Sequence, residues 1–375
     1  MGIQGEPPSF AERYFKVREK RTTIRTELLA GCTTFIAMAY ILFVNPNILA
    51  EAGIPKEAAI ASTIWIAALG SIAMGLFANY PVALAPGMGL NAFFAYYVCG
   101  VLGLHWTVAL GAVFFSGILF LILTVGGIRQ AIINAVPRDL KLAISVGIGL
   151  FIAFIGLKGT GLIVENSATY VSLGHITAPT TLLALFGLLF TAALMARNIH
   201  GSILIGIFVT TLLAILFGLT PGPQSYADII STSLPHMGET FGKLDFIGAW
   251  NYGLLSIIFT FTVVELFDNM GTLIGLTTKA KMVRPDGQIE NIDRALTTDA
   301  VGTMVSAVFG TSTVTSYIES AAGIAVGGRT GITAIAAGVL FLSAFFFTPL
   351  IGLVPAFATA PALILVGALL MSEVG

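Results

Sequence analysis

Long apolar stretches, separated by short polar or proline- and glycine-containing breaks, fill the chain from residue 28 to its end. A helix that crosses a bilayer needs about 20 predominantly apolar residues. Stretches of this size predict about twelve spans, with approximate limits of 28–45, 58–79, 82–100, 106–126, 139–157, 178–196, 201–219, 248–276, 294–309, 311–327, 332–350 and 353–372. The pattern therefore predicts an all-α polytopic membrane protein.

Composition agrees with this prediction. Of the 375 residues, 56% are hydrophobic and 10% are charged, whereas a soluble domain carries about 25% charged residues. The net charge of -1 gives no reason to expect a nucleic-acid partner. The first 27 residues are polar and basic, and the apolar stretch after them is longer than a signal-peptide core, so we expect no cleaved signal peptide.

The basic residues predict an orientation. Lys and Arg accumulate in cytoplasmic loops of membrane proteins. We expect the protein to lie in the cell (inner) membrane with its N-terminus in the cytoplasm. In this orientation, fifteen of the eighteen basic residues fall on the cytoplasmic side. The exceptions are Lys56, Lys158 and Lys243. One span more or fewer would move many of these basic residues to the other side of the membrane. Their distribution therefore supports the predicted number of spans.

Two of the predicted spans begin with poor helix formers. The third opens with residues 81–91, which contain two prolines and two glycines, and the tenth opens with the hydroxyl-rich residues 310–317. They are separated by about 228 residues, and the long polar insert at 220–245 places seven spans before it. Because seven is odd, the two halves run in opposite directions. Paired interrupted helices in an inverted repeat mark the central site of many transporters.

Three carboxylates sit where a bilayer should exclude them: Glu265 and Asp268 in the eighth predicted span, and Glu319 in the tenth. An acid at the centre of a transmembrane helix costs about 2.5–3.5 kcal/mol, so such residues are functional by default. A buried pair that joins helices is the alternative, but no Lys or Arg lies at the depth of these acids. We therefore expect the three carboxylates to face a cavity.

The spacing of these acids adds detail. Glu265 and Asp268 are separated by three residues and share a helical face. Two close carboxylates in a medium of low dielectric constant do not easily ionise together, so one of them can carry a proton. Asn91 matches Glu319 at the 228-residue offset, and we expect it to contact a ligand, to cap the half-helix that begins there, or to do both.

Glycine pairs at four-residue spacing also occur in these spans. Gly271 with Gly275, and Gly323 with Gly327, have the spacing that lets membrane helices approach closely. We expect them to serve helix packing.

Motifs for other chemistry are weak. Residues 87–92 fit G-x-G-x-x-A, but no soluble strand precedes them and no acid follows near residue 110. The Gly242-Lys243 pair is followed by Leu, so it does not form a nucleotide-binding P-loop. Cys32 and Cys99 lie in apolar stretches, and the four histidines are scattered. We expect no metal, no cofactor and no enzymatic activity.

Three segments resemble the AzgA-like purine permeases of the nucleobase-ascorbate and uracil permease superfamily. They are residues 85–93 (APGMGLNAF), 265–272 (ELFDNMGT) and 310–323 (GTSTVTSYIESAAG), and the resemblance extends from residue 10 to the end of the chain. The resemblance implies a fold of two inverted repeats with seven spans each. It also implies that the protein imports adenine, guanine, hypoxanthine or xanthine by proton symport, driven by the proton gradient.

The resemblance also implies a division of the chain. Residues 1–27 form a cytoplasmic segment, 28–126 and 248–350 form a core that carries substrate, 127–219 form a gate, 220–247 form an extracytoplasmic insert, and 351–375 start a second half of the gate. Family members have fourteen spans, so the last two helices are expected to be absent here. A homodimer embedded in membrane lipid is one assembly that the resemblance allows.

Substrate contacts are implied for Glu265, Glu319 and Asn91, and proton coupling for Asp268 and Glu265. Phe93, Phe94 and Phe267 are candidate stacking faces. Asn269 departs from the family pattern, which often has Thr after the second acid. The alternatives are a uracil or xanthine permease, which favours a Gln-x-x-Pro-x-Thr pattern near the tenth span, and an anion exchanger or channel of the same fold, which three acids disfavour.

Overall fold

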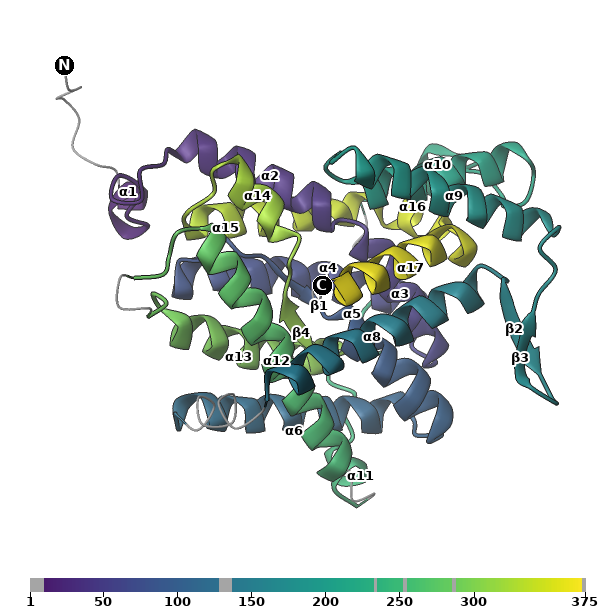
Figure 1. The fold of residues 1–375 in the computed structure, drawn as a ribbon, viewed down its shortest axis with the longest axis horizontal. Helices are drawn as coiled ribbons and strands as arrows, with labels where there is room; N and C mark the ends of the chain where they lie inside the picture. The colour runs from purple at the N-terminus through teal and green to yellow at the C-terminus, as the bar shows by residue number, and fades with distance from the viewer. Residues whose placement is uncertain (1–9, 128–136, 233–234, 252–254, 285–287, 373–375) are drawn as a thin grey trace.

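The computed structural model describes residues 10–127, 137–232, 235–251, 255–284 and 288–372 (Figure 1). Each of the twelve predicted spans corresponds to a helix, or to a strand followed by a helix, so the all-α polytopic prediction is confirmed. Seven of the described helices are long and apolar enough to cross a membrane. Arg129, counted above among the cytoplasmic basic residues, lies outside the described residues.

The first half of the chain contains seven predicted spans. The short helix α1 (Phe10–Tyr14) precedes them. The spans are α2 (Ile24–Met38) with α3 (Ile41–Glu51), α4 (Lys56–Ala73) with the π-helical η1 (Met74–Ala78), β1 (Leu84–Pro86) with α5 (Met88–Ala92) and η2 (Phe93–Val101), α6 (Trp106–Val125), α8 (Arg138–Gly159), α9 (Pro179–Ala196) and α10 (Ser202–Leu216). The hairpin of β2 (Ile163–Asn166) and β3 (Tyr170–Leu173) joins α8 to α9.

The second half begins after the polar insert, which contains the short η3 (Tyr226–Asp228). It comprises α11 (Phe246–Asn251), α12 (Leu255–Lys279), α13 (Ile292–Phe309), β4 (Val314–Ser316) with α14 (Ser320–Val326), α15 (Gly331–Ser343) with η4 (Ala344–Phe347) and α16 (Thr348–Leu353), and α17 (Ala356–Ser372).

The two interrupted segments meet at the centre of the molecule. β1 and β4 pair in antiparallel orientation, with Leu84 opposite Ser316 and Pro86 opposite Val314. Proline cannot continue a helix and lacks an N–H donor, so a short extended segment satisfies this backbone better than a helix does. Both strands are fully buried. The two helix interruptions predicted from the sequence are therefore confirmed.

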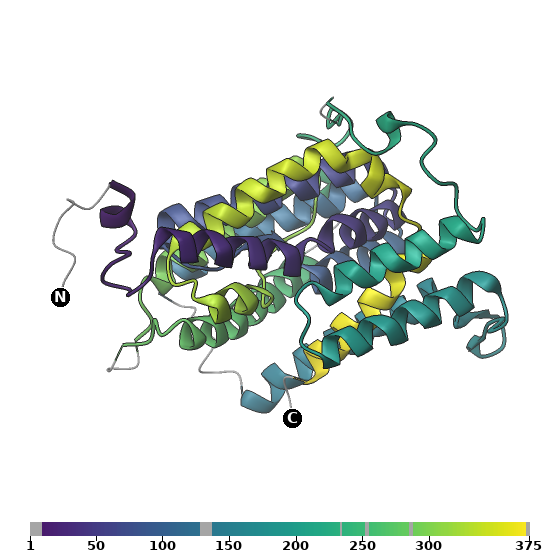
Figure 2. The same ribbon diagram turned by 90° about the horizontal axis from the view of Figure 1, so that it is seen from above.

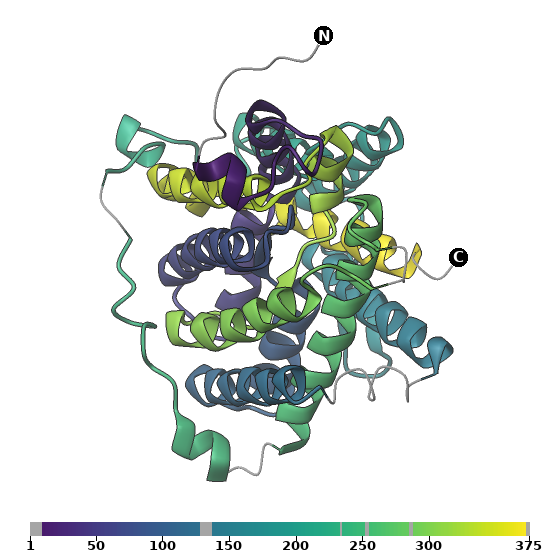
Figure 3. The ribbon, with the colours of Figure 1, turned by 90° about the vertical axis from the view of Figure 1, so that its left-hand side faces the viewer.

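Helix packing reflects the inverted repeat. The second, third and fourth spans of one half correspond to the ninth, tenth and eleventh spans of the other. α4 packs against α15, and its counterpart α13 packs against α6; α2 packs against α15, and its counterpart α12 packs against α6. Figure 3 shows α15, α4, α13 and α6 stacked side by side.

A second group of helices consists of α8, α9, α10 and α17. α17 packs against α8, α9 and α10, and α9 packs against α10. Figure 2 shows the teal α9 and α10 and the yellow α17 lying together beside the remaining helices. The group touches the rest of the molecule at fewer places, mainly where α17 meets α3 and α8 meets α5.

The glycine pairs differ in their surroundings. A Cβ at Gly323 would meet Ala30 and Thr34 of α2, so this glycine permits the close approach of α14 to α2. A Cβ at Gly271 or Gly275 would meet no atom of the described residues within 4 Å. The packing role predicted for Gly271 and Gly275 is therefore wrong.

Candidate functional site

A cavity of about 280 Å³ lies beside the paired strands β1 and β4. Its walls come from both halves of the chain and from both groups of helices, because α5, α8, α12, α17 and the segment around β4 all contribute. The residues that line it are Tyr40, Met88, Gly89, Leu90, Leu142, Ile144, Ser145, Ile148, Val264, Phe267, Asp268, Met270, Gly271, Thr272, Ile274, Thr315, Ser316, Tyr317, Ile318, Glu319, Val366 and Leu370.

Glu319 lines this cavity immediately after β4. Its Oε1 accepts a hydrogen bond of 2.5 Å from the hydroxyl of Tyr40, which lies between α2 and α3 and is 1% exposed. The neighbouring Tyr317 donates to the carbonyl oxygen of Pro86 at 2.6 Å and so joins the two interrupted segments. Two tyrosines therefore fix the carboxylate and the backbone that carries it.

The two acids of α12 face different neighbours. Asp268 and Phe267 line the cavity. Glu265, almost one turn earlier, is fully buried; its Oε1 accepts a hydrogen bond from the Thr303 hydroxyl of α13, and its Oε2 has no hydrogen-bond partner among the described residues. Of this pair, only Asp268 lines the cavity.

Asn91 lies inside α5, behind the cavity wall formed by Met88, Gly89 and Leu90. Its Nδ2 donates to Asn45 Oδ1 at 2.5 Å, and its Oδ1 has no partner among the described residues. The N-cap of α5 is Gly87. The capping role considered for Asn91 is therefore wrong, because the half-helix begins before Asn91, at Met88.

The three phenylalanines considered as stacking faces differ in their positions relative to the cavity. Phe267 faces the cavity, whereas Phe93 stacks on Tyr97 with ring centroids 5.1 Å apart and packs edge-on against Phe261. Phe94 is fully buried in the core. A stacking role in the cavity is open to Phe267, while Phe93 and Phe94 lie outside the cavity lining.

Sequence reasoning missed Asp299, a fully buried acid of α13. The hydroxyl of Ser316 lies 3.1 Å from Asp299 Oδ2, and the backbone N–H of Ser316 donates to Asn269 Oδ1 at 2.8 Å. These bonds tie β4 to α13 and α12, directly behind the cavity wall. The signal was present, because residue 299 is an acid within a predicted span.

The charge of the cavity limits what it can bind. Two carboxylates, Asp268 and Glu319, line it, and no Lys, Arg or His is among its described lining residues. Apolar side chains of α5, α8 and α17 complete the walls. Ionised carboxylates only accept hydrogen bonds, so the arrangement favours a small, flat ligand that presents N–H donors on its edge.

Comparisons with known proteins give a family match and named relatives. A model described as the Permease family (Xan_ur_permease) matches residues 25–375. The adenine permease AdeP of Escherichia coli is 48% identical, covering 96% of this chain and 80% of the relative. The guanine/hypoxanthine permease PbuG of Bacillus subtilis is 43% identical, covering 96% of this chain and 84% of the relative.

Among solved structures, the transmembrane domain of the cyanobacterial bicarbonate transporter BicA has the same fold. The TM-score is 0.71 at 15% identity, over 92% of this chain and 89% of the other. At that identity, the likeness concerns the fold alone.

Proposed function

We propose that this chain, which belongs to the permease family, transports purine nucleobases across the membrane and binds them in the cavity beside β1 and β4. The observation that carries the proposal is an apolar cavity with two carboxylates at the junction of two interrupted helices. The names of the relatives, which are adenine and guanine/hypoxanthine permeases, support the same substrate class.

Purine chemistry fits these groups. A purine presents ring and exocyclic N–H donors on one flat edge, and a carboxylate offers about four acceptor positions. Glu319 can accept such donors while it holds Tyr40. Phe267 offers an aromatic face for stacking. The volume of about 280 Å³ lies just below the usual range of about 300–1,000 Å³ for ligand pockets, which suits a single base.

Proton coupling is assigned to Asp268, with Glu265 as a second candidate. Asp268 reaches the cavity, so a change in its protonation alters the field that the substrate meets. Glu265 is enclosed between α12 and α13, where Thr303 stabilises it. We infer proton symport driven by the proton gradient, with no other cofactor.

The two groups of helices are assigned as core and gate. Residues 28–126 and 248–350 form the core that holds the interrupted segments, and α8, α9, α10 and α17 belong to the gate. The cavity has walls from both, so relative movement of the groups opens it to either side. A homodimer through the gate helices fits this division.

We place the N-terminus in the cytoplasm, with the protein in the cell membrane. The ion pair between Lys20 and Glu290 puts the N-terminal segment and the loop between α12 and α13 on one side. A cysteine introduced at Arg284 is therefore expected to resist impermeant maleimides added outside intact cells. Labelling from outside contradicts the orientation.

An anion exchanger is the second candidate, because the bicarbonate transporter shares the fold. An anion site needs a basic residue or bare N–H groups, and the described lining contributes two carboxylates and no basic side chain. A uracil permease remains the nearer alternative, because uracil also presents N–H donors. Purine transport is consistent both with the acceptor groups of the cavity and with the substrates in the relatives' names.

Uptake of labelled bases by permease-deficient cells tests the proposal. We expect the chain to raise uptake of adenine or hypoxanthine, unlabelled purines to compete, and a protonophore to abolish accumulation. Uracil and bicarbonate are the comparison competitors. Competition by uracil but not by purines contradicts the proposed substrate class, and accumulation that persists with the protonophore contradicts proton coupling.

A further inference from the structure

A second cavity, of about 490 Å³, lies where α1, η1 and α13 meet, on the side of the N-terminus. It shares no lining residue with the central cavity. The residues that line it are Tyr14, Phe77, Asp293, Arg294, Thr297, Thr298 and Val301. The cavity is thus a separate surface groove that the transport mechanism above does not use.

The groove is polar at one end and apolar at the other. Arg294, Thr297 and Val301 follow one another at spacings of three and four residues and so lie on one face of α13. Arg294 is exposed, and Val301 is 40% exposed. Seven residues of helix span about 10 Å. The charge therefore lies at the end of the span, and the exposed apolar side chain lies one to two helical turns deeper.

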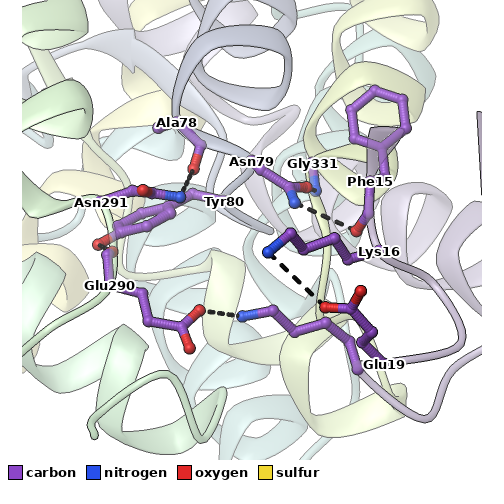
Figure 4. A network of polar contacts seen from close by, with 10 residues as sticks. Phe15, Lys16, Glu19, Ala78, Asn79, Tyr80, Glu290, Asn291 and Gly331 are labelled. Atoms are coloured by element: carbon purple, nitrogen blue, oxygen red, sulfur yellow. Dashed lines mark hydrogen bonds and ion pairs between the residues drawn. The ribbon is translucent and has the colours of Figure 1, made fainter. Parts of the chain in front are cut away.

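The opposite wall is aromatic and firmly held. Phe77 is 65% exposed, and Tyr14 donates a hydrogen bond of 2.8 Å to the carbonyl oxygen of Leu76. Figure 4 shows Asn79 donating to the carbonyl oxygen of Phe15, at 3.1 Å, which fixes the segment that carries Tyr14. An exposed Phe beside a hydrogen-bonded Tyr is typical of a membrane–water interface, where one end of the site is apolar and the other is wet.

Basic residues near the groove differ in their pairing. Within residues 13–25, Lys16, Arg18 and Lys20 form ion pairs with Glu19, Glu12 and Glu290, respectively. Arg13, adjacent to Tyr14, and Arg294 form no such pair among the described residues. The charged residues of the lining itself are Arg294 and Asp293. The polar end of the groove therefore offers one guanidinium group, that of Arg294, which has no ion pair among the described residues.

We propose that this groove binds an anionic phospholipid from the surrounding bilayer. Its phosphate lies against Arg294, and one acyl chain follows Phe77 and Val301 toward the membrane interior. The guanidinium of Arg294 complements an anionic headgroup, and the exposed side chains of Phe77 and Val301 form an apolar end that suits an acyl chain. A phosphopeptide or free phosphate accounts for Arg294 but not for the exposed apolar end.

Lipid titration of the purified full chain, followed by native mass spectrometry, tests the proposal. The probes are phosphatidylglycerol and phosphatidylcholine with identical acyl chains, glycerophosphoglycerol without chains, and inorganic phosphate. One basic residue near an anionic headgroup contributes about 1 kcal/mol, which is about a fivefold change in affinity. We expect phosphatidylglycerol to bind about fivefold more tightly than phosphatidylcholine, and Arg294→Gln to remove that difference.

Two matched variants separate this site from general lipid adhesion. Arg197→Gln removes an exposed arginine at the end of α9, and Phe217→Ala removes a phenyl ring that is 68% exposed, close to the 65% of Phe77. Both are expected to keep the preference, whereas Phe77→Ala weakens binding of both lipids. Monodispersity on size-exclusion chromatography shows that each variant is folded, and no arm depends on transport.

Three outcomes overturn the proposal. Equal affinity of the unaltered protein for the two lipids contradicts a contact with the anionic headgroup. An unchanged preference of Arg294→Gln for phosphatidylglycerol over phosphatidylcholine contradicts binding in this groove. Displacement of phosphatidylglycerol by inorganic phosphate or glycerophosphoglycerol at equal concentration shows a simple anion site without a role for the acyl chain.

Discussion

Replacement of Glu319 by Gln probes the proposed principal substrate contact, because the change keeps the shape of the side chain and alters its hydrogen-bonding groups. In the protein, the carboxylate accepts a hydrogen bond of 2.5 Å from Tyr40 while it faces the cavity. A Gln that keeps its oxygen on Tyr40 presents an NH₂ group to the N–H donors of a purine. A rotated amide presents its oxygen to the purine, but the Tyr40 proton then loses its acceptor.

Either orientation leaves one buried polar group without its partner, which costs about 1–3 kcal/mol. This corresponds to purine affinity that is about 5- to 150-fold weaker. Equilibrium binding of labelled adenine or hypoxanthine to purified protein measures the change. Glu165→Gln is the matched control, because that side chain is 83% exposed and pairs with Lys158 far from the cavity. An unchanged dissociation constant in Glu319→Gln removes this carboxylate from the site.

Two further substitutions test Asp268, which lines the cavity, and Glu27, which is buried in α2. Asp268→Asn is expected to keep purine affinity within about threefold and to flatten the dependence of uptake on pH between about 5 and 8, because it removes a titrating group; an unaltered profile excludes Asp268 from the proton path. Glu27→Gln is expected to lower the melting temperature in detergent by destabilising the fold by about 1–3 kcal/mol, because Glu27 accepts from the backbone N–H groups of Arg329 and Thr330 at 2.9 and 3.1 Å. The control for Glu27 is Glu57→Gln, because Glu57 is an exposed acid in the first turn of α4. Equal melting temperatures of the two variants contradict a stabilising role for the hydrogen bonds of Glu27.

The spans and their two interruptions could be predicted from the sequence because each rests on local properties. Apolar length sets a span, and the prolines of residues 81–86 exclude a regular helix wherever the segment lies. The pairing of β1 with β4 joins residues more than 200 positions apart. The repeat offset suggested that they correspond, but only the fold brings them into contact.

The spacing of residues along the sequence could not predict which neighbour each side chain would face. Glu265 and Asp268 share a helical face, yet α13 covers one of them and the cavity borders the other. Tyr40 carried no signal, because an aromatic residue in a span is ordinary and its contact with Glu319 spans 279 positions. Glu27 was assigned to a polar terminal segment, although it is buried in α2, where it accepts the backbone N–H of Thr330, the N-cap residue of α15.

Protection of a cysteine in the central cavity tests the account most directly. Ser145 of α8 lines the cavity and has no role in the proposed contacts. In a background in which the free cysteines Cys32 and Cys99 are replaced by Ala, Ser145→Cys reacts with a small uncharged maleimide, and Thr297→Cys in the separate groove is the control. We predict that saturating adenine or hypoxanthine slows labelling at position 145 at least several-fold and leaves position 297 unchanged. Equal labelling rates at position 145, under conditions where purine binding is measured independently, contradict purine occupation of this cavity.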